Sequence, residues 1–198
     1  GLAILGKLTK LRRLKLGYLS FTPNGLASLS GLTNLESLSL ESVEGCVTGD
    51  SLKSLCKLVH LRKLNLDSCP TFDDDAMSAL VHFTELEHLN IAKTMFKRGL
   101  QYLSSTTHPR LTYLDISFSE KLDDAGLKYI SRLSNLSTLH MYRCPKGHLT
   151  TKGTRALLEL LKLDLLDVRE CPISKDVGKV LRGRIKDMRE DLGNLNSV

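Results

Sequence analysis

Apolar residues recur along the chain with one spacing that returns every 24 to 27 residues. In the stretch 61–70, Leu61, Leu64 and Leu66 form the pattern Leu-x-x-Leu-x-Leu. The spacing recurs with first positions 11, 35, 61, 86, 111, 136 and 163, which lie 24, 26, 25, 25, 25 and 27 residues apart. Alternation at period two predicts a short β-strand in each segment. Self-similarity at this period predicts a solenoid of about seven copies of one structural unit, with parallel strands.

The segment after each strand predicts the start of a helix. Thr22, Thr48, Asp73 and Asp123 each follow an apolar residue and lie four residues before another. This arrangement is typical of an N-cap with a hydrophobic staple, in which the cap oxygen accepts a hydrogen bond from a backbone N–H of the first turn. The unit at 96–103 lacks a cap, because Lys97 stands there. We therefore expect an irregular turn in that unit.

The two ends differ from the repeated units. Residues 1–10 resemble the second half of a unit, so the chain opens within a truncated repeat and we expect it to be a piece of a longer protein. Residues 11–172 hold the repeats. Apolar spacing predicts a C-terminal capping helix over 173–190, and residues 191–198 form a tail. We expect a single domain over 1–198.

Composition is typical of a globular chain, and it limits the classes of partner. The 198 residues are 41% hydrophobic and 25% charged, and the net charge of +6 is only mildly basic. Acidic residues are interspersed, so a nucleic-acid partner is disfavoured. The alternative is nucleic-acid binding through the basic face of the predicted end helix, which carries Lys175, Lys179, Arg182, Arg184 and Arg189.

Cysteine usage points to a reducing compartment. The five cysteines are odd in number and include no Cys-x-x-Cys pair, which favours reduced thiols over disulfides or a zinc site. No signal peptide and no run long enough to span a membrane is visible. We expect a cytoplasmic or nuclear protein without a membrane partner.

The extended pattern is Leu-x-x-Leu-x-Leu-x-x-Cys, then an apolar residue, Thr or Asp, and a Gly-Leu pair. It resembles the cysteine-containing class of leucine-rich repeats. Cys69, Cys144 and Cys171 occupy the diagnostic position, and other residues replace cysteine in the remaining units. This position should turn inward after the strand, so we expect these three thiols to be reduced and buried. The class includes ribonuclease-inhibitor-like proteins and the repeat domains of F-box substrate receptors. The resemblance implies an α/β horseshoe with a concave parallel sheet and convex helices. It also implies protein recognition, with a fragment of a ubiquitin-ligase substrate receptor as an alternative.

Several residue clusters could carry chemistry, but each has a simpler structural interpretation. Asp73, Asp74 and Asp75 lie at a predicted helix N-terminus, where carboxylates favour the helix dipole, and they lack the spacing of a calcium loop. Cys56 and His60 are only two ligands for a metal. No Gly-x-Ser-x-Gly nucleophile motif occurs. We expect no catalytic residue, metal, cofactor or small-molecule substrate.

The outward positions of the strands remain as a candidate binding surface. Alternation places the residues between the leucines on the exposed side of the sheet, and adjacent strands lie about 4.8 Å apart. Large aromatic and polar residues fall on three consecutive strands, where they can form one patch: His88, Tyr113, Phe118, His140, Tyr142 and Arg143. The alternative is scattered surface aromatics that only support one another. The prediction is a non-catalytic interaction module that binds a partner protein on its concave face, as a scaffold or a substrate-recognition domain.

Overall fold

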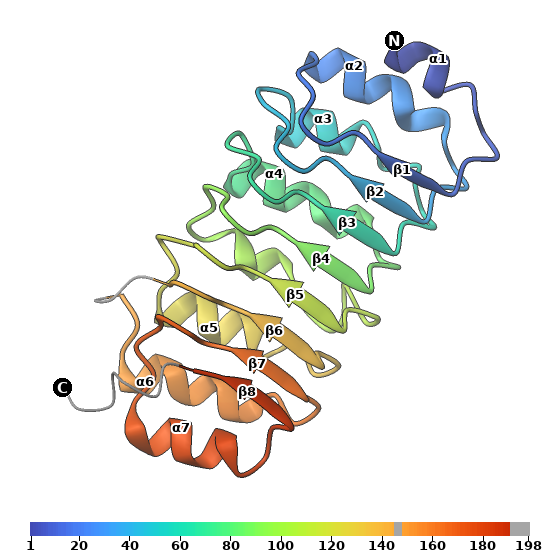
Figure 1. The fold of residues 1–198 in the computed structure, drawn as a ribbon. Coiled ribbons are helices and arrows are strands. Elements are labelled where there is room, and N and C mark those ends of the chain that lie inside the picture. Colours follow the sequence, from blue (N-terminus) through green and yellow to red (C-terminus); the bar gives the residue numbers. More distant parts are fainter. Residues whose placement is uncertain (145–147, 191–198) are drawn as a thin grey trace.

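The structure is a computed structural model that describes residues 1–144 and 148–190. It contains one sheet of parallel strands in sequence order, seen face-on in Figure 1. The tail expected at 191–198 lies outside the described residues. The eight strands are β1 (Arg13–Lys15), β2 (Ser37–Ser39), β3 (Lys63–Asn65), β4 (His88–Asn90), β5 (Tyr113–Asp115), β6 (Thr138–His140), β7 (Leu165–Asp167) and β8 (Asp187–Arg189).

The register of the sheet follows from the repeated leucine pattern. The middle residue of each strand pairs with the middle residue of the next, as Leu64 does with Leu38 and Leu89. Because alternation points all of these side chains to one side, they stack into a continuous apolar layer. Leu61 and Leu66 are buried beside Leu64 in the same layer. The expected α/β solenoid is confirmed, and its sheet is open and uncurled (Figure 1).

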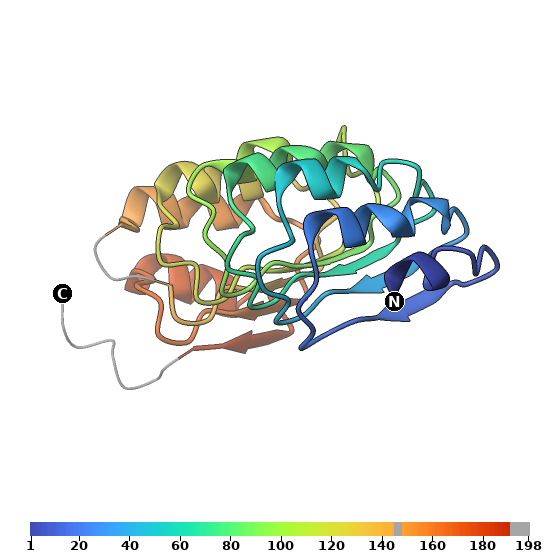
Figure 2. The ribbon, with the colours of Figure 1, turned by 90° about the horizontal axis from the view of Figure 1, so that it is seen from above.

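The helices cover one side of the sheet (Figure 2). The buried leucine side chains lie in the core between them. They are short, because each unit leaves room for only one or two turns. The α-helices are α1 (Leu2–Leu5), α2 (Pro23–Ala27), α3 (Gly49–Lys53), α4 (Asp74–Ser78), α5 (Asp124–Ile130), α6 (Thr151–Thr154) and α7 (Lys175–Arg182). The 3₁₀ helices are η1 (Ser28–Gly31), η2 (Ala79–His82), η3 (Gly99–Tyr102) and η4 (Arg155–Glu159).

The predicted N-caps are confirmed. The side chains of Thr22, Thr48, Asp73 and Asp123 each accept a hydrogen bond from a backbone N–H in the first turn of the following helix. Thr48 also takes part in a reciprocal capping box, in which the hydroxyl of Ser51 accepts from the Thr48 N–H. The helical half of a unit is therefore defined by local sequence as well as by its apolar face.

The unit at 96–103 is irregular, as its missing cap predicts, and it is capped by its neighbour. It contains only the 3₁₀ turn η3. Asp74 Oδ1, in the preceding unit, accepts hydrogen bonds from the N–H groups of Lys97, Arg98 and Gly99 at 2.8, 2.9 and 2.8 Å. One carboxylate thus replaces the acceptor that the Lys97 side chain cannot supply. Asp124 makes a related contact, accepting from the Thr150 N–H of the next unit at 2.8 Å.

The C-terminal end departs from the prediction of one helix over 173–190 and of seven strands. Helix α7 ends at Arg182, and the chain then adds β8, in which Met188 pairs with Leu166 of β7. Ile185 and Met188 have the spacing of the first two leucines of a unit, and the same spacing also fits one face of a helix. The helix interpretation was wrong for these two residues, because pairing with the open edge of β7 satisfies the backbone of residues 187–189.

A left-handed turn follows each of the first seven strands. Its residue has φ between 53° and 60° although it is never glycine, and the seven positions are Tyr18, Ser42, Ser68, Lys93, Phe118, Arg143 and Glu170. Side-chain oxygens on four strands support these turns, because Asn65, Asn90, Asp115 and Asp167 each accept from the N–H two residues ahead. Such Asx turns stabilise a conformation that otherwise costs about 1–2 kcal/mol.

The cysteines at the repeat position are reduced, and their burial is uneven. None of the five cysteines forms a disulfide. Cys69 and Cys144 are buried, as expected, and burial raises the pKa of Cys69 to about 11. Cys171 is only half-buried, so the expectation of full burial was wrong there. Its thiol donates to the carbonyl of Met141 and accepts from the N–H of Cys144.

Candidate functional site

The candidate site lies on the outward side of the sheet, which we call the strand face. It consists of the outward side chains of β1 to β8 and of the residues that follow β1 to β7, up to and including the left-handed residue. All six predicted residues lie on this face, half-buried except for Arg143, which is exposed. Direct ring contacts join them into two groups. His88, Tyr113 and His140 form the first group. Phe118, Tyr142 and Arg143 form the second group.

The first group is a run of rings across β4, β5 and β6. Tyr113 stacks on His88 with ring centroids 5.1 Å apart, and its other contact is with His140 at 5.4 Å. Burial, and then the charge of Lys63, lower the pKa of His88, so this imidazole is neutral at pH 7. Burial, and then the charge of Asp115, raise the pKa of Tyr113. His88 and Tyr113 therefore present neutral rings with polar edges.

The second group is centred on Phe118. The edge of its ring meets Tyr142 at 5.1 Å between centroids, and the cations of Lys93 and Arg143 lie 5.3 and 5.7 Å from the ring centre. Phe118 takes the left-handed conformation, which carries its ring to the end of the strand. Cations over an aromatic face are held electrostatically. Phe118 thus organises the positive groups around it.

Tyr142 is held by its hydroxyl. Its O–H donates to Glu170 Oε1 at 2.6 Å, and this hydrogen bond is the main reason that its pKa is raised. The guanidinium of Arg169 lies 5.2 Å from the ring centre of Tyr142. A large ring held at its hydroxyl and over one face loses little further freedom on binding, which suits an anchor at an interface.

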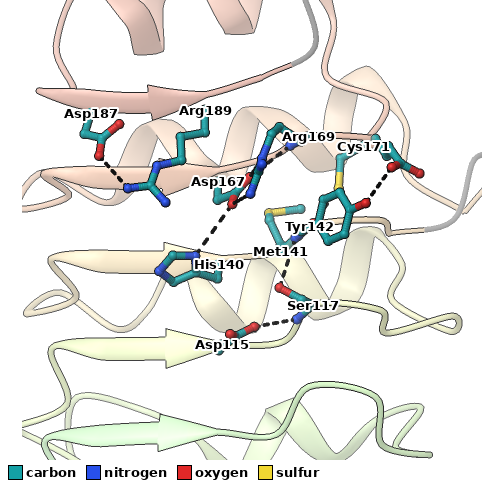
Figure 3. A network of polar contacts seen from close by, with 11 residues as sticks. Asp115, Ser117, His140, Met141, Tyr142, Asp167, Arg169, Cys171, Asp187 and Arg189 are labelled. Carbon is teal, nitrogen blue, oxygen red and sulfur yellow. Dashed lines mark hydrogen bonds and ion pairs between the residues drawn. The ribbon is translucent and has the colours of Figure 1, made fainter. Parts of the chain in front are cut away.

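A buried carboxylate organises the polar contacts beside these rings, and the candidate residues did not include it. Asp167 accepts from Arg169 through two hydrogen bonds of 2.9 and 2.6 Å, and lies 3.8 Å from His140 Nδ1 (Figure 3). Burial acts to raise the pKa of Asp167, but the hydrogen bonds and charge of Arg169 outweigh it, so the net shift is downward. The signal in the sequence was an acid and a base two residues apart, at the last position of β7 and just after it, where alternation continued past the strand places them on the same side.

The basic C-terminal helix offers fewer available cations than its sequence indicates. Arg184 donates to the backbone carbonyls of residues 157, 158 and 160, so it closes the end of η4. Arg182 is paired with Glu190. Lys175 and Lys179 are the cations of α7 left without an ion pair among the described residues. The arrangement gives no continuous basic stripe along this helix.

Across residues 1–144 and 148–190, no three His, Cys, Asp or Glu side chains lie close enough together to hold a metal ion. No described helix combines the length and apolar character that crossing a bilayer requires. The chemistry that the strand face itself offers is aromatic contact, hydrogen bonding and charge.

Strand-and-helix units with one shared leucine layer and an open face of strand side chains define a repeat solenoid. The chain belongs to the leucine-rich repeat family, because the family profile described as a leucine-rich repeat region matches residues 2–176. Domains of this family are commonly protein-interaction modules. The cysteine-containing subclass remains a prediction. No curated protein matches the chain.

Solved structures show the same fold at low sequence identity. An internalin (inlF) from Listeria monocytogenes str. 4b F2365 is 16% identical, with a TM-score of 0.60 over 96% of this chain and 58% of that chain. An internalin C2 (inlC2) from the same organism is 18% identical, with a TM-score of 0.60 over 94% of this chain and 84% of that chain. The chain thus spans less than two thirds of the first of these proteins. At such identities the likeness concerns the fold.

Proposed function

We propose that this chain is a non-catalytic protein-interaction module and that its partner protein docks on the strand face. The observation that carries the proposal is the pair of aromatic groups on β4 to β6, centred on Tyr113 and on Phe118. Tyr and Arg are enriched among residues that dominate binding energy, and these groups place Tyr142 and Arg143 beside each other at one end of the strands.

The fold favours a rigid binding surface. Each strand is fixed by parallel pairing to its neighbours and by a fully apolar layer beneath it, as Leu139 is beneath His140. Side chains on such a frame keep their positions before a partner arrives, which lowers the entropy lost on association. The role is that of a scaffold or a substrate-recognition domain.

The alternatives are less well supported. A fragment of a ubiquitin-ligase substrate receptor is a special case of the same function, and only the resemblance of the cysteine pattern points to it. Nucleic-acid binding through α7 would have to rely on Lys175 and Lys179, since Arg184 is engaged with backbone carbonyls. Five free thiols favour a reducing compartment, so we place the protein in the cytoplasm or nucleus.

Comparative capture with matched tyrosine variants tests the proposal. Tyr142→Ala removes an anchor of the strand face, and Tyr129→Ala removes a tyrosine of α5 on the helical side. A partner protein that both the parent and Tyr129→Ala capture is identified, and its affinity is measured by calorimetry. Tyr142→Ala should weaken its binding free energy by about 2 kcal/mol or more. Both variants should keep the parent's circular dichroism. Because Tyr129 packs partly against the core, the melting temperature of each variant is measured and the capture is performed well below both.

Two results would contradict the proposal. In the first, Tyr142→Ala and Arg143→Ala bind the captured partner as the parent does. In the second, binding is lost with Lys175→Ala and Lys179→Ala instead, and the ligand is a nucleic acid whose affinity falls steeply with salt. The second result would assign the binding site to α7.

A further inference from the structure

Two ion pairs beside β1 to β4 on the strand face are unequal in exposure, and in each of them the cation is the outer member. The Lys15 side chain is 68% exposed and its partner Glu41 is 22% exposed. For Lys93 and Asp67 the fractions are 49% and 21%. The carboxylates lie close to the sheet because they are short, and the longer cations extend past them toward solvent. A partner that approaches this face meets positive charge first.

Two further cations on the same part of the face have no acid beside them. Arg13 on β1 and Lys63 on β3 are exposed and make no ion pair with any described residue. We call the part of the strand face made by β1 to β4 and the residues that follow them the donor half. It carries four cations and two carboxylates: Arg13, Lys15, Lys63 and Lys93 against Glu41 and Asp67.

The uncharged side chains of the donor half also present hydrogen-bond donors. The Oδ1 atoms of Asn65 and Asn90 each accept, at 3.0 Å, from the backbone N–H two residues ahead. This contact turns each amide so that its oxygen faces the backbone and its NH₂ group faces away. These two NH₂ groups make no hydrogen bond among the described residues. They lie on adjacent paired strands, so they can be satisfied together by one extended ligand.

The other half of the strand face carries no excess of cations, since Arg143, Arg169 and Arg189 stand against Asp115, Asp167, Glu170 and Asp187. On β7 the carboxylate of Asp167 binds Arg169 in two hydrogen bonds, and on β8 Asp187 pairs with Arg189. Arg143 pairs with Glu170. The excess of cations and donors is therefore confined to β1–β4, and it borders the aromatic groups of β4 to β6.

We propose that the partner presents an acidic, extended protein segment whose carboxylates and backbone carbonyls lie across the donor half, with an apolar side chain against the aromatic groups. This inference rests on the proposed function and specifies the chemistry of the partner. Charge complementarity is its basis. Nucleic acid is the poorer match, because Glu41 and Asp67 lie beneath the cations and only Arg13 and Lys63 are free to neutralise closely spaced phosphates.

Peptide selection tests the inference without a known partner. A display library of random peptides is selected on the parent chain and then screened against Tyr142→Ala to keep binders of the strand face. Enriched peptides are synthesised, and their affinities are measured by fluorescence anisotropy on the parent, on Lys63→Glu and on Lys128→Glu. Lys128 is an exposed lysine of α5, so the two charge reversals alter net charge equally on opposite sides of the molecule.

Support would be enrichment of Asp and Glu in the selected peptides. Lys63→Glu should then weaken binding about tenfold or more, and Lys128→Glu should leave it nearly unchanged. Peptides that depend on Tyr142 but are neutral or basic would overturn the acidic partner while leaving the proposed function standing. A selection with no Tyr142-dependent peptide would overturn both. Duplex DNA that binds with the same Lys63 dependence, in the absence of acidic binders, would replace the inference with a nucleic-acid site.

Discussion

Asp74→Ala should destabilise the whole solenoid although the residue is only half-buried. The substitution removes one oxygen that accepts from three successive backbone N–H groups, those of Lys97, Arg98 and Gly99. These donors start the turn η3, where no local cap is present. After the substitution these N–H groups must bind water or remain without an acceptor, and the three hydrogen bonds between the two units are lost.

The expected cost is about 2–3 kcal/mol. A hydrogen bond to a charged group contributes about 1.5–3 kcal/mol net, and loss of a cap costs about 1–2 kcal/mol. The three bonds share one oxygen, so their contributions are not additive. For a chain of this length, about 2–4 °C is lost per kcal/mol, so the melting temperature should fall by roughly 4–12 °C.

Urea unfolding followed by far-ultraviolet circular dichroism measures this cost. Asp75→Ala is the matched control, because Asp75 lies on the same helix and makes only an exposed ion pair with Lys53. That variant should lose less than about 1 kcal/mol. Amide hydrogen exchange at residues 97–99 should accelerate in Asp74→Ala alone. Equal destabilisation by the two variants would refute the capping role of Asp74.

Three further outcomes follow from the core. His108 is buried, and burial lowers its pKa although a hydrogen bond to the Leu80 carbonyl acts to raise it. As the pH falls, this histidine therefore takes up a proton in the unfolded chain before it does so in the folded protein. The free energy of unfolding should accordingly decrease below about pH 6.5, by up to ~1.4 kcal/mol per pH unit. In His108→Gln this part of the pH dependence should vanish. If the free energy of unfolding of the variant falls with pH as steeply as that of the parent, the role of His108 is contradicted. Leu139→Ala should cost about 2–5 kcal/mol in urea unfolding through a buried cavity, and a loss below 1 kcal/mol would count against the shared core layer. In native labelling by a thiol reagent read by mass spectrometry, exposed Cys56 should react before buried Cys69, and equal rates would contradict the described burial.

The sequence predicted the sheet well because strand position, register and facing depend on one spacing. Once Leu64 faces inward, Lys63 and Asn65 must face outward, and each repeat aligns with the next. The eighth strand was missed because Ile185 and Met188 fit a helix and a strand equally. That ambiguity is settled by tertiary pairing with β7, which no local pattern contains.

For the candidate site, the sequence predicted which residues point outward but not which of their side chains touch. Alternation placed Tyr113, His140 and Tyr142 outward, yet it could not show that the six residues divide into two ring groups, because ring contacts depend on side-chain rotamers. Asp167 was overlooked because its burial results from Arg169 lying over it. The role of Asp74 was hidden for a similar reason, since its partners lie one unit further along the chain.

The left-handed turns bear on how this surface can change. Their seven residues are Tyr, Ser, Ser, Lys, Phe, Arg and Glu, which share no chemistry beyond an unbranched Cβ, and β-branched residues fit such a conformation poorly. A glycine would relieve the backbone but display nothing to a partner. At these positions the side chain can therefore vary while the backbone conformation stays the same. A library that varies Ser42, Ser68 and Lys93 among unbranched residues could redirect recognition while each member keeps the same fold.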